Sequence, residues 1–192
     1  MPKTLKGTET ERLLLTAFAG ESQARNRYTY AASVARKEGY EQIAAIFQAT
    51  ADNEKEHAQV FFKHLQGGMA EITATYPAGT IDTTEGNLRH AAEGEHLEWG
   101  TLYPNAAAVA DREGFPEVAR SFRNIAKVES EHEKRYLKLL ENVKTKTVFK
   151  KSKTVKWRCR NCGYVHEGPE APLTCPACQH PQSYYELFVE AY

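Results

Sequence analysis

Long hydrophobic runs, an excess of charge of either sign and an apolar N-terminal stretch are all missing from this chain of 192 residues. Because its uncharged apolar runs are only a few residues long, we expect no membrane-spanning helix. Lysine plus arginine number 25, and so do aspartate plus glutamate, so bulk charge does not favour binding to nucleic acid or to an anionic membrane. The polar N-terminus lacks a secretory signal, which makes the cytoplasm the expected location.

Cysteine is scarce, and all four cysteines lie between residues 159 and 178. In a reducing cytoplasm such cysteines are more often metal ligands or redox groups than disulfides. The pairs Cys159-x-x-Cys162 and Cys175-x-x-Cys178 predict one tetrahedral site with four thiolate ligands. Few lysines and arginines surround them, which does not favour a nucleic-acid surface. From this segment alone, zinc and iron are equally compatible.

The residue that follows each cysteine pair forms the turn of the metal knuckle. Gly163 follows the first pair and can adopt the positive φ that directs backbone N–H groups toward thiolate sulfur. Gln179 holds the same place after the second pair. The sequence therefore predicts a less favourable turn in the second knuckle.

The N-terminal part of the chain contains two helix hairpins of one design, with apolar residues at helical spacing. Glu54-x-x-His57 in the first hairpin recurs 75 residues later as Glu129-x-x-His132 in the second. The long connection between the hairpins, residues 66–83, can run the length of a bundle. An all-α four-helix bundle with one long crossover is therefore the predicted fold.

Further glutamates are expected at the same height along the bundle axis as the two Glu-x-x-His motifs. Burying five carboxylates and two imidazoles at one level without a cation would be prohibitively costly, so the repeated register predicts a metal site. Its oxygen-rich composition favours iron or manganese over zinc or copper. The predicted metal-binding and catalytic residues are Glu21, Glu54, His57, Glu95, Glu98, Glu129 and His132.

The arrangement resembles that of the ferritin-like di-iron carboxylate proteins, in which two helices give one glutamate each and two give Glu-x-x-His. This resemblance implies that Glu54 and Glu129 bridge the two metals. The terminal ligands it implies are Glu21, Glu95, His57 and His132. Glu98 is additional to that scheme, so the two halves are chemically unequal.

Two tyrosines are predicted to support the ligands. Tyr28 lies seven residues from Glu21, and Tyr103 lies eight residues from Glu95, about two helical turns in each case. Each can therefore hydrogen-bond a ligand carboxylate. A core tyrosine with some other acceptor is nearly as compatible with the sequence.

Two features belong to the third helix alone. Glu93-x-x-His96 has no counterpart in the first hairpin, and we assign it to a solvated face. The second hairpin also has one extra residue between Glu95 and Tyr103. An extra residue in a helix whose two ends keep register is most simply absorbed by a wide turn, so the sequence predicts a π-bulge there.

The whole chain resembles the rubrerythrins, from the segment 20–28 (GESQARNRY) to the segment 157–164 (WRCRNCGY). This resemblance implies a ferritin-like bundle over residues 1–145, a linker over 146–153 and a small β rubredoxin-like domain over 154–192. It implies a non-haem di-iron centre in the bundle and one iron held by the four cysteines, with zinc possible in either site as purified. In that family the equivalents of His57 and Glu98 exchange as ligands of one iron with redox state.

The resemblance also implies a function and partners. A homodimer would reduce hydrogen peroxide to water in the defence against oxidative stress, as a non-haem di-iron peroxidase. Its electrons would pass through the four-cysteine iron from a rubredoxin or an external NAD(P)H-dependent reductase. The chain has no G-x-G-x-x-G fingerprint, so direct nicotinamide binding is not expected.

Two other functions use parts of the same pattern. A ferroxidase or iron-storage protein could have the same bundle, but oxidation of iron by oxygen or peroxide needs no electron-donor domain. A zinc-ribbon binding module on a helical scaffold is the alternative of another class. A visible spectrum distinguishes the zinc-ribbon module from the iron-containing alternatives, because ferric iron with four thiolates is red and a zinc ribbon is colourless.

Overall fold

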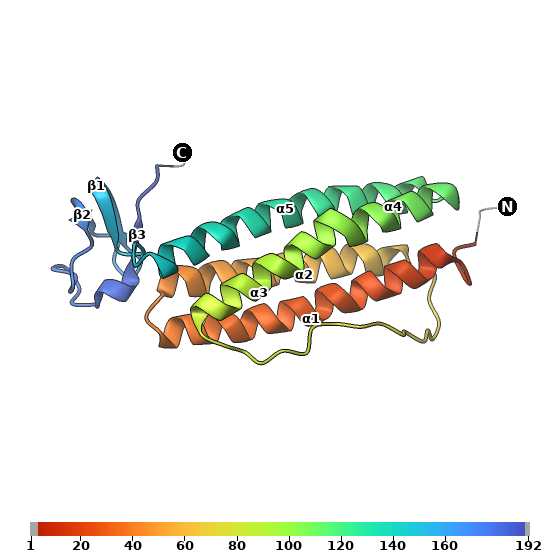
Figure 1. Ribbon diagram of the computed structural model, residues 1–192, viewed down its shortest axis with the longest axis horizontal. Helices are drawn as coiled ribbons and strands as arrows, with labels where there is room; N and C mark the ends of the chain where they lie inside the picture. The colour runs from red at the N-terminus through yellow and green to blue at the C-terminus, as the bar shows by residue number, and fades with distance from the viewer. Residues whose placement is uncertain (1–3, 191–192) are drawn as a thin grey trace.

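Four helical rods lie side by side in the computed structural model, which describes residues 4–190 (Figure 1). The helices are α1 (Glu9–Lys37), α2 (Glu41–His64), α3 (Thr84–Leu97), η1 (Glu98–Leu102), α4 (Tyr103–Arg112) and α5 (Pro116–Lys144). The elements α3, η1 and α4 follow one another without a break and form the third rod. The predicted four-helix bundle is confirmed. No helix of the described part combines the length and apolarity needed to cross a membrane.

Each hairpin turns at a glycine with a left-handed backbone, Gly39 at φ +83° and Gly114 at φ +76°. Glycine adopts this conformation without the steric cost that a side chain adds. Between the hairpins an irregular crossover, residues 65–83, runs along α1 to the start of α3 (Figure 1). The Tyr76 hydroxyl donates to the carbonyl oxygen of Thr16 at 2.6 Å and ties the crossover to α1.

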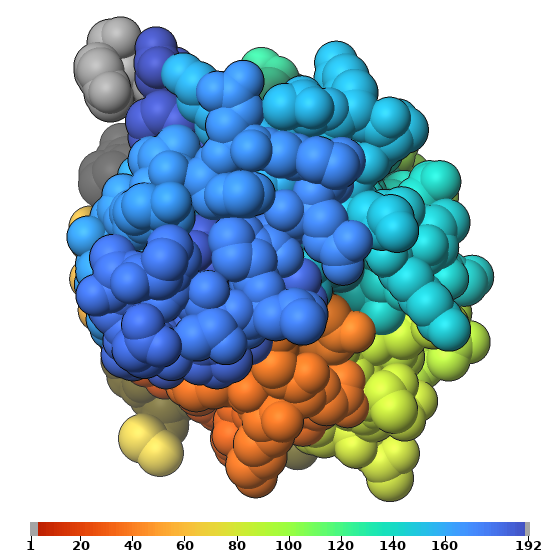
Figure 2. All heavy atoms as spheres, turned by 90° about the vertical axis from the view of Figure 1, so that its left-hand side faces the viewer, coloured from red at the N-terminus to blue at the C-terminus, as the bar shows by residue number. Residues whose placement is uncertain are grey.

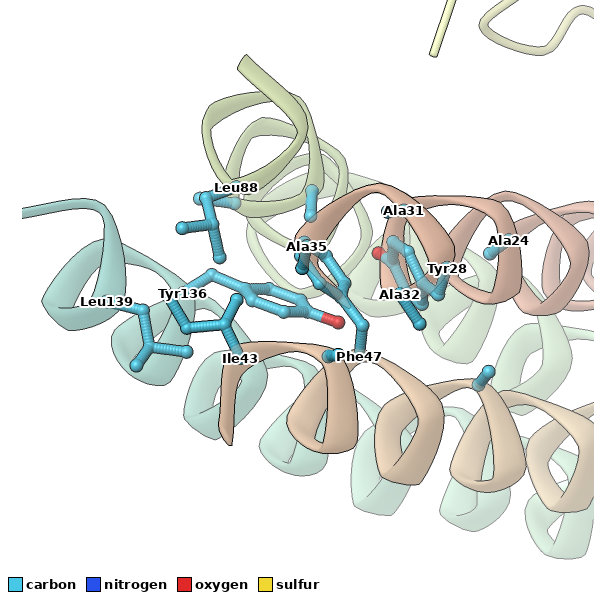
Figure 3. Close-up of a cluster of buried hydrophobic side chains, with 14 residues drawn as sticks. Ala24, Tyr28, Ala31, Ala32, Ala35, Ile43, Phe47, Leu88, Tyr136 and Leu139 are labelled. Atoms are coloured by element: carbon cyan, nitrogen blue, oxygen red, sulfur yellow. The ribbon is translucent and has the colours of Figure 1, made fainter. Parts of the chain in front are cut away.

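Two apolar clusters fill the bundle, one on each side of the Glu-x-x-His level. In the first, shown in Figure 3, Tyr136 packs against Phe47 and Tyr28 with ring centroids 5.1 and 5.5 Å apart. In the second, Phe61 packs against Phe122 with centroids 4.8 Å apart. Because both clusters are tightly buried, they keep bulk water away from the level between them.

A small antiparallel sheet follows the bundle. Its strands are β1 (Lys150–Cys159), β2 (Val165–Glu170) and β3 (Tyr185–Leu187), in the order β2-β1-β3, with a 3₁₀ turn η2 (Gln182–Tyr184) before β3. Trp157 is fully buried, and its indole N–H donates to the carbonyl oxygen of Gly168 at 3.0 Å. This core is small, as expected of a domain that depends on a metal for stability.

The connection between bundle and sheet is shorter than the linker predicted over 146–153. Helix α5 ends at Lys144 and β1 begins at Lys150, so 150–153 belong to the strand. This correction has a physical reason, since Lys150 pairs with Glu170 of β2. Phe149 in the connection stacks on Tyr40 at the α1–α2 turn, with ring centroids 6.1 Å apart and planes 9° apart. The sheet domain is therefore docked on that end of the bundle (Figure 2).

Candidate metal centres

The two Glu-x-x-His motifs face each other from α2 and α5. Within each motif the imidazole Nδ1 lies 2.8 Å from its own glutamate, His57 from Glu54 and His132 from Glu129. Across the bundle, His57 Nδ1 lies 2.8 Å from Glu129 Oε1, and His132 Nδ1 lies 3.2 Å from Glu54 Oε1. Each glutamate therefore stands between both histidines.

Helices α1 and α3 complete the group with Glu21 and Glu95. Glu21 Oε2 lies 3.9 Å from His57 Nδ1, and Glu95 Oε1 lies 3.7 Å from His132 Nδ1. The donors form two overlapping sets whose atoms lie within 4.8 Å of one another, namely Glu21, Glu54, His57, Glu129 and Glu54, Glu95, Glu129, His132. The two sets share both motif glutamates, which is the geometry expected of two ions bridged by two carboxylates.

Within the described residues, several buried oxygens of the group make no hydrogen bond of good geometry, although imidazole nitrogens lie close to some of them: Glu21 Oε2, Glu54 Oε1, Glu95 Oε2 and both carboxylate oxygens of Glu129. No donor residue of the two sets is more than 9% exposed. Burying carboxylates without compensating positive charge costs several kcal/mol per group. The donor set therefore fits cations.

The pKa shifts of these groups agree with a site that binds cations. Burial, together with neighbouring carboxylates, raises the pKa of Glu21 and of Glu95. Burial also opposes ionisation of Glu54, but the two histidines outweigh it and lower its pKa to about 2. For His57, burial lowers the pKa, yet the motif glutamates outweigh burial and raise it to about 10. The centre of the site thus attracts positive charge.

Both predicted tyrosines bond carboxylates of the group, but each reaches across to the other hairpin. The Tyr28 hydroxyl donates to Glu95 Oε1 at 2.7 Å, and the Tyr103 hydroxyl donates to Glu21 Oε1 at 2.5 Å. The sequence predicted the bonding to ligand carboxylates. It did not predict the crossing, because the partner depends on which helices lie side by side.

The predicted π-bulge is confirmed as η1, which begins at Glu98 and ends one residue before Tyr103. Glu98 is half-buried and belongs to neither of the two donor sets. Burial and the charges of Glu129 and Glu54 raise its pKa, so it lies within electrostatic reach of the group. Six of the seven predicted residues are therefore brought together, with Glu98 beside them.

Glu93 and His96 lie on the exposed face, as predicted. His96 nevertheless has a partner that the sequence did not indicate, because its Nδ1 lies 3.0 Å from Glu133 Oε1. The indole N–H of Trp99 donates to the other oxygen of Glu133 at 2.6 Å. Glu133 on α5 thus contacts His96 and Trp99, which lie on either side of Glu98 in the sequence. No periodicity or motif in the sequence indicated this contact.

The four cysteines form the second group. Cys159 Sγ lies 3.8 Å from Cys178 Sγ, and Cys162 Sγ lies 3.7 Å from Cys175 Sγ, so none of these pairs is a disulfide. A tetrahedral ion with metal–sulfur distances near 2.3 Å needs sulfurs about 3.8 Å apart. The spacing therefore fits one four-coordinate metal ion.

The two knuckles have the same backbone geometry. Gly163 N–H donates to Cys159 O and Gln179 N–H donates to Cys175 O, both at 2.9 Å. Gln179 adopts φ +61° and Gly163 φ +81°, so the second turn matches the first despite its side chain. The backbone N–H of His180 lowers the pKa of Cys178 to about 6, which favours the thiolate that binds metal.

Two family models match this chain. The model described as rubrerythrin matches residues 12–140, and the model described as the rubrerythrin rubredoxin-like domain matches residues 157–186. The first span contains all the Glu and His donors, and the second contains the four cysteines.

Similar proteins extend along nearly the whole chain. A rubrerythrin of Porphyromonas gingivalis is 60% identical over 186 residues, covering 97% of this chain and 93% of that protein. A rubrerythrin of Nitratidesulfovibrio vulgaris is 54% identical over 185 residues, covering 96% of this chain and 97% of that protein. A solved structure of fully reduced, all-ferrous nigerythrin has a TM-score of 0.63 at 31% identity, covering 97% of this chain and 89% of that one.

Proposed function

Because the chain belongs to the rubrerythrin family, which consists of oxidoreductases, we propose that it reduces hydrogen peroxide to water in the defence against oxidative stress. The bundle carries a di-iron site with Glu and His ligands, and the C-terminal domain carries a four-cysteine rubredoxin-like site. The observation that carries the proposal is the presence of both sites in one chain. An enzyme that spends two electrons per turnover needs a route by which they are replaced.

In this proposal Glu54 and Glu129 would each hold both irons, because both belong to both donor sets. Glu21 and His57 would complete the ligands of one iron, and Glu95 and His132 those of the other. Glu98 would replace His57 as a ligand when the redox state changes, as the family resemblance implies. Its place beside the group, outside both donor sets, agrees with the arrangement in which His57 is the ligand.

Reduction of hydrogen peroxide consumes two electrons and two protons and yields two waters, and the iron pair supplies both electrons and a Lewis-acid site. The chain's own residues prepare that site. Tyr28 and Tyr103 fix the terminal carboxylates by hydrogen bonds. The apolar clusters above and below exclude bulk water, so the charges of the carboxylates act at low dielectric.

We assign the electron relay to the four-cysteine site, supplied by a rubredoxin or an NAD(P)H-dependent reductase. Glu54 lies fourteen residues beyond Tyr40, or roughly 21 Å along α2, whereas the sheet domain docks beside Tyr40. This separation within one chain supports a homodimer in which the relay serves the bundle of the second subunit. Unpaired thiols suit a reducing compartment, and the cytoplasm is the location we propose.

Purified protein with iron in both sites, mixed with NADH and a rubredoxin reductase, tests the proposal. Addition of hydrogen peroxide should cause NADH oxidation that depends on the protein, with iron at three ions per chain. Ferroxidase or storage activity is the rival that the same bundle allows. Uptake of many iron ions per chain without peroxide-dependent NADH oxidation would favour that rival and contradict our proposal.

A further inference from the structure

A cavity of about 190 Å³ lies between α1, the third rod and the crossover, directly beside the di-iron group. Its wall includes Glu98 and both tyrosines that bond the terminal carboxylates, Tyr28 and Tyr103. The remaining wall is predominantly apolar, with Leu13, Leu97, Leu102 and Phe122 among its members. The cavity therefore has a polar end at Glu98 and the tyrosines and mostly apolar sides, to which Gln23, Arg27 and His90 add polar groups.

The cavity exists because side chains are missing from two helix faces. Gly20 and Gly94 line it, and they occupy corresponding places in the two hairpins, each one residue before a ligand glutamate. A Cβ atom on Gly94 would meet no atom within 4 Å. A Cβ atom on Gly20 would lie 3.4 Å from Cε1 of Tyr76. The wall at Gly94 thus faces open space.

The crossover closes the cavity on its outer side. Thr75, Tyr76 and Pro77 contribute to the wall, and the bond from the Tyr76 hydroxyl to Thr16 O fixes this part of the crossover on α1. Figure 1 shows the crossover following α1. The volume of about 190 Å³ therefore limits the occupant to a small molecule.

Hydrogen peroxide alone does not account for such a space. It is close in size to water, whose share of liquid volume is about 30 Å³, and it needs hydrogen-bond partners that this predominantly apolar wall offers at only a few points. An apolar cavity of roughly 150 Å³ holds a benzene molecule. The volume and lining of this cavity therefore match an apolar group about the size of one aromatic ring, with a polar group directed toward Glu98.

We propose that the cavity binds the apolar tail of a small organic hydroperoxide and that the protein reduces this class of substrate as well as hydrogen peroxide. The inference rests on the peroxidase function proposed above. In the reaction, ROOH takes up two electrons and two protons, the O–O bond breaks, and ROH and water leave. The two electrons come from the reduced iron pair, so the balance needs no additional reductant.

Binding of the product alcohol tests the cavity without any turnover. Calorimetric titration of the iron-loaded protein with 2-phenyl-2-propanol should give saturable binding, and Gly94→Leu should weaken it at least about tenfold because the new side chain fills the space. Gly79→Leu is the matched control, since a Cβ there also meets nothing within 4 Å but Gly79 does not line the cavity. Absence of binding to the unmodified protein, or equal binding to both variants, would overturn the inference.

Turnover with two peroxides separates this inference from the proposed function. Gly94→Leu should raise KM for cumene hydroperoxide at least about tenfold and change KM for hydrogen peroxide less than about twofold, with iron content unchanged. An equal rise in KM for both peroxides would overturn the proposal that the cavity binds the apolar tail of the substrate. Turnover of hydrogen peroxide but not of cumene hydroperoxide by the unmodified protein would overturn the inference alone. Failure with both peroxides would overturn the proposed function and this inference with it.

Discussion

The two metal centres of this chain are both built by duplication, yet they differ in where their donors come from and in how far they are buried. The bundle site takes its six donors from four helical rods, and all of them are buried. The cysteine site takes its four donors from two knuckles of one small domain, and Cys162 is exposed.

This difference in burial corresponds to different tasks. A buried site with unpaired carboxylate oxygens excludes bulk water and holds charge, which suits bond-breaking chemistry. A site with an exposed thiolate can approach another protein, which suits exchange of single electrons. We therefore expect that a substitution at the ligands of one site impairs that site and leaves the other site intact.

The largest expected effect is the loss of iron from the bundle in Glu54→Ala or Glu129→Ala. Each change removes a carboxylate that belongs to both donor sets, so both ions lose a ligand. Iron analysis should show most of the bundle iron gone and the four-cysteine iron retained. Glu93→Ala and His96→Ala are the controls, and bundle iron should stay unchanged in both. A loss in His96→Ala comparable to that in Glu54→Ala would contradict the assignment.

A smaller effect is expected when the tyrosines lose their hydroxyl groups. Tyr28→Phe and Tyr103→Phe each remove one hydrogen bond to a terminal carboxylate, so bundle iron affinity should fall about 10- to 100-fold in both. Competition with a chelator measures the affinity, and the four-cysteine iron gives the internal reference. A loss of iron affinity in one variant but not in the other would show that the two tyrosines do not support the site equally.

The smallest effect concerns pH and the metal-free bundle. His57 has a pKa raised to about 10, and the pKa values of Glu21 and Glu95 are also raised. Raised values mean that the folded state binds more protons than the unfolded state, so stability is lost as pH rises. The unfolding free energy should fall by on the order of 2 kcal/mol between about pH 6 and pH 9.

Helical circular dichroism during urea unfolding measures this free energy at each pH. The iron-loaded protein is the reference and should change less, because the cations take the place of the protons. A metal-free profile that stays flat or rises with pH would contradict the view that the site's centre attracts positive charge.

The sequence was most informative where ligands are close along the chain or repeated in register. The cysteine site follows from two local pairs, and the Glu and His donors follow from matched positions in two hairpins. The π-helix η1 follows from one extra residue between Glu95 and Tyr103. In each case a local rule or a repeat fixes the position without knowledge of the packing.

What the sequence could not give depends on contacts between distant elements. The crossed bonds of Tyr28 and Tyr103 require knowing which helices are neighbours. The place of Glu98 beside the group depends on how the π-turn directs its side chain. The early start of β1 depends on pairing with β2, and the cavity depends on the path of the crossover.

The central claim, that the bundle reacts with peroxide and the cysteine site only refills it, is tested most directly by stopped-flow spectroscopy of Cys159→Ser. The chemically reduced variant, with normal di-iron content, should oxidise its iron pair with one equivalent of hydrogen peroxide as the unmodified protein does. Its steady-state turnover with NADH and a reductase should fall steeply, because the relay is broken. If single-turnover oxidation disappears together with steady-state activity, the division of labour is wrong.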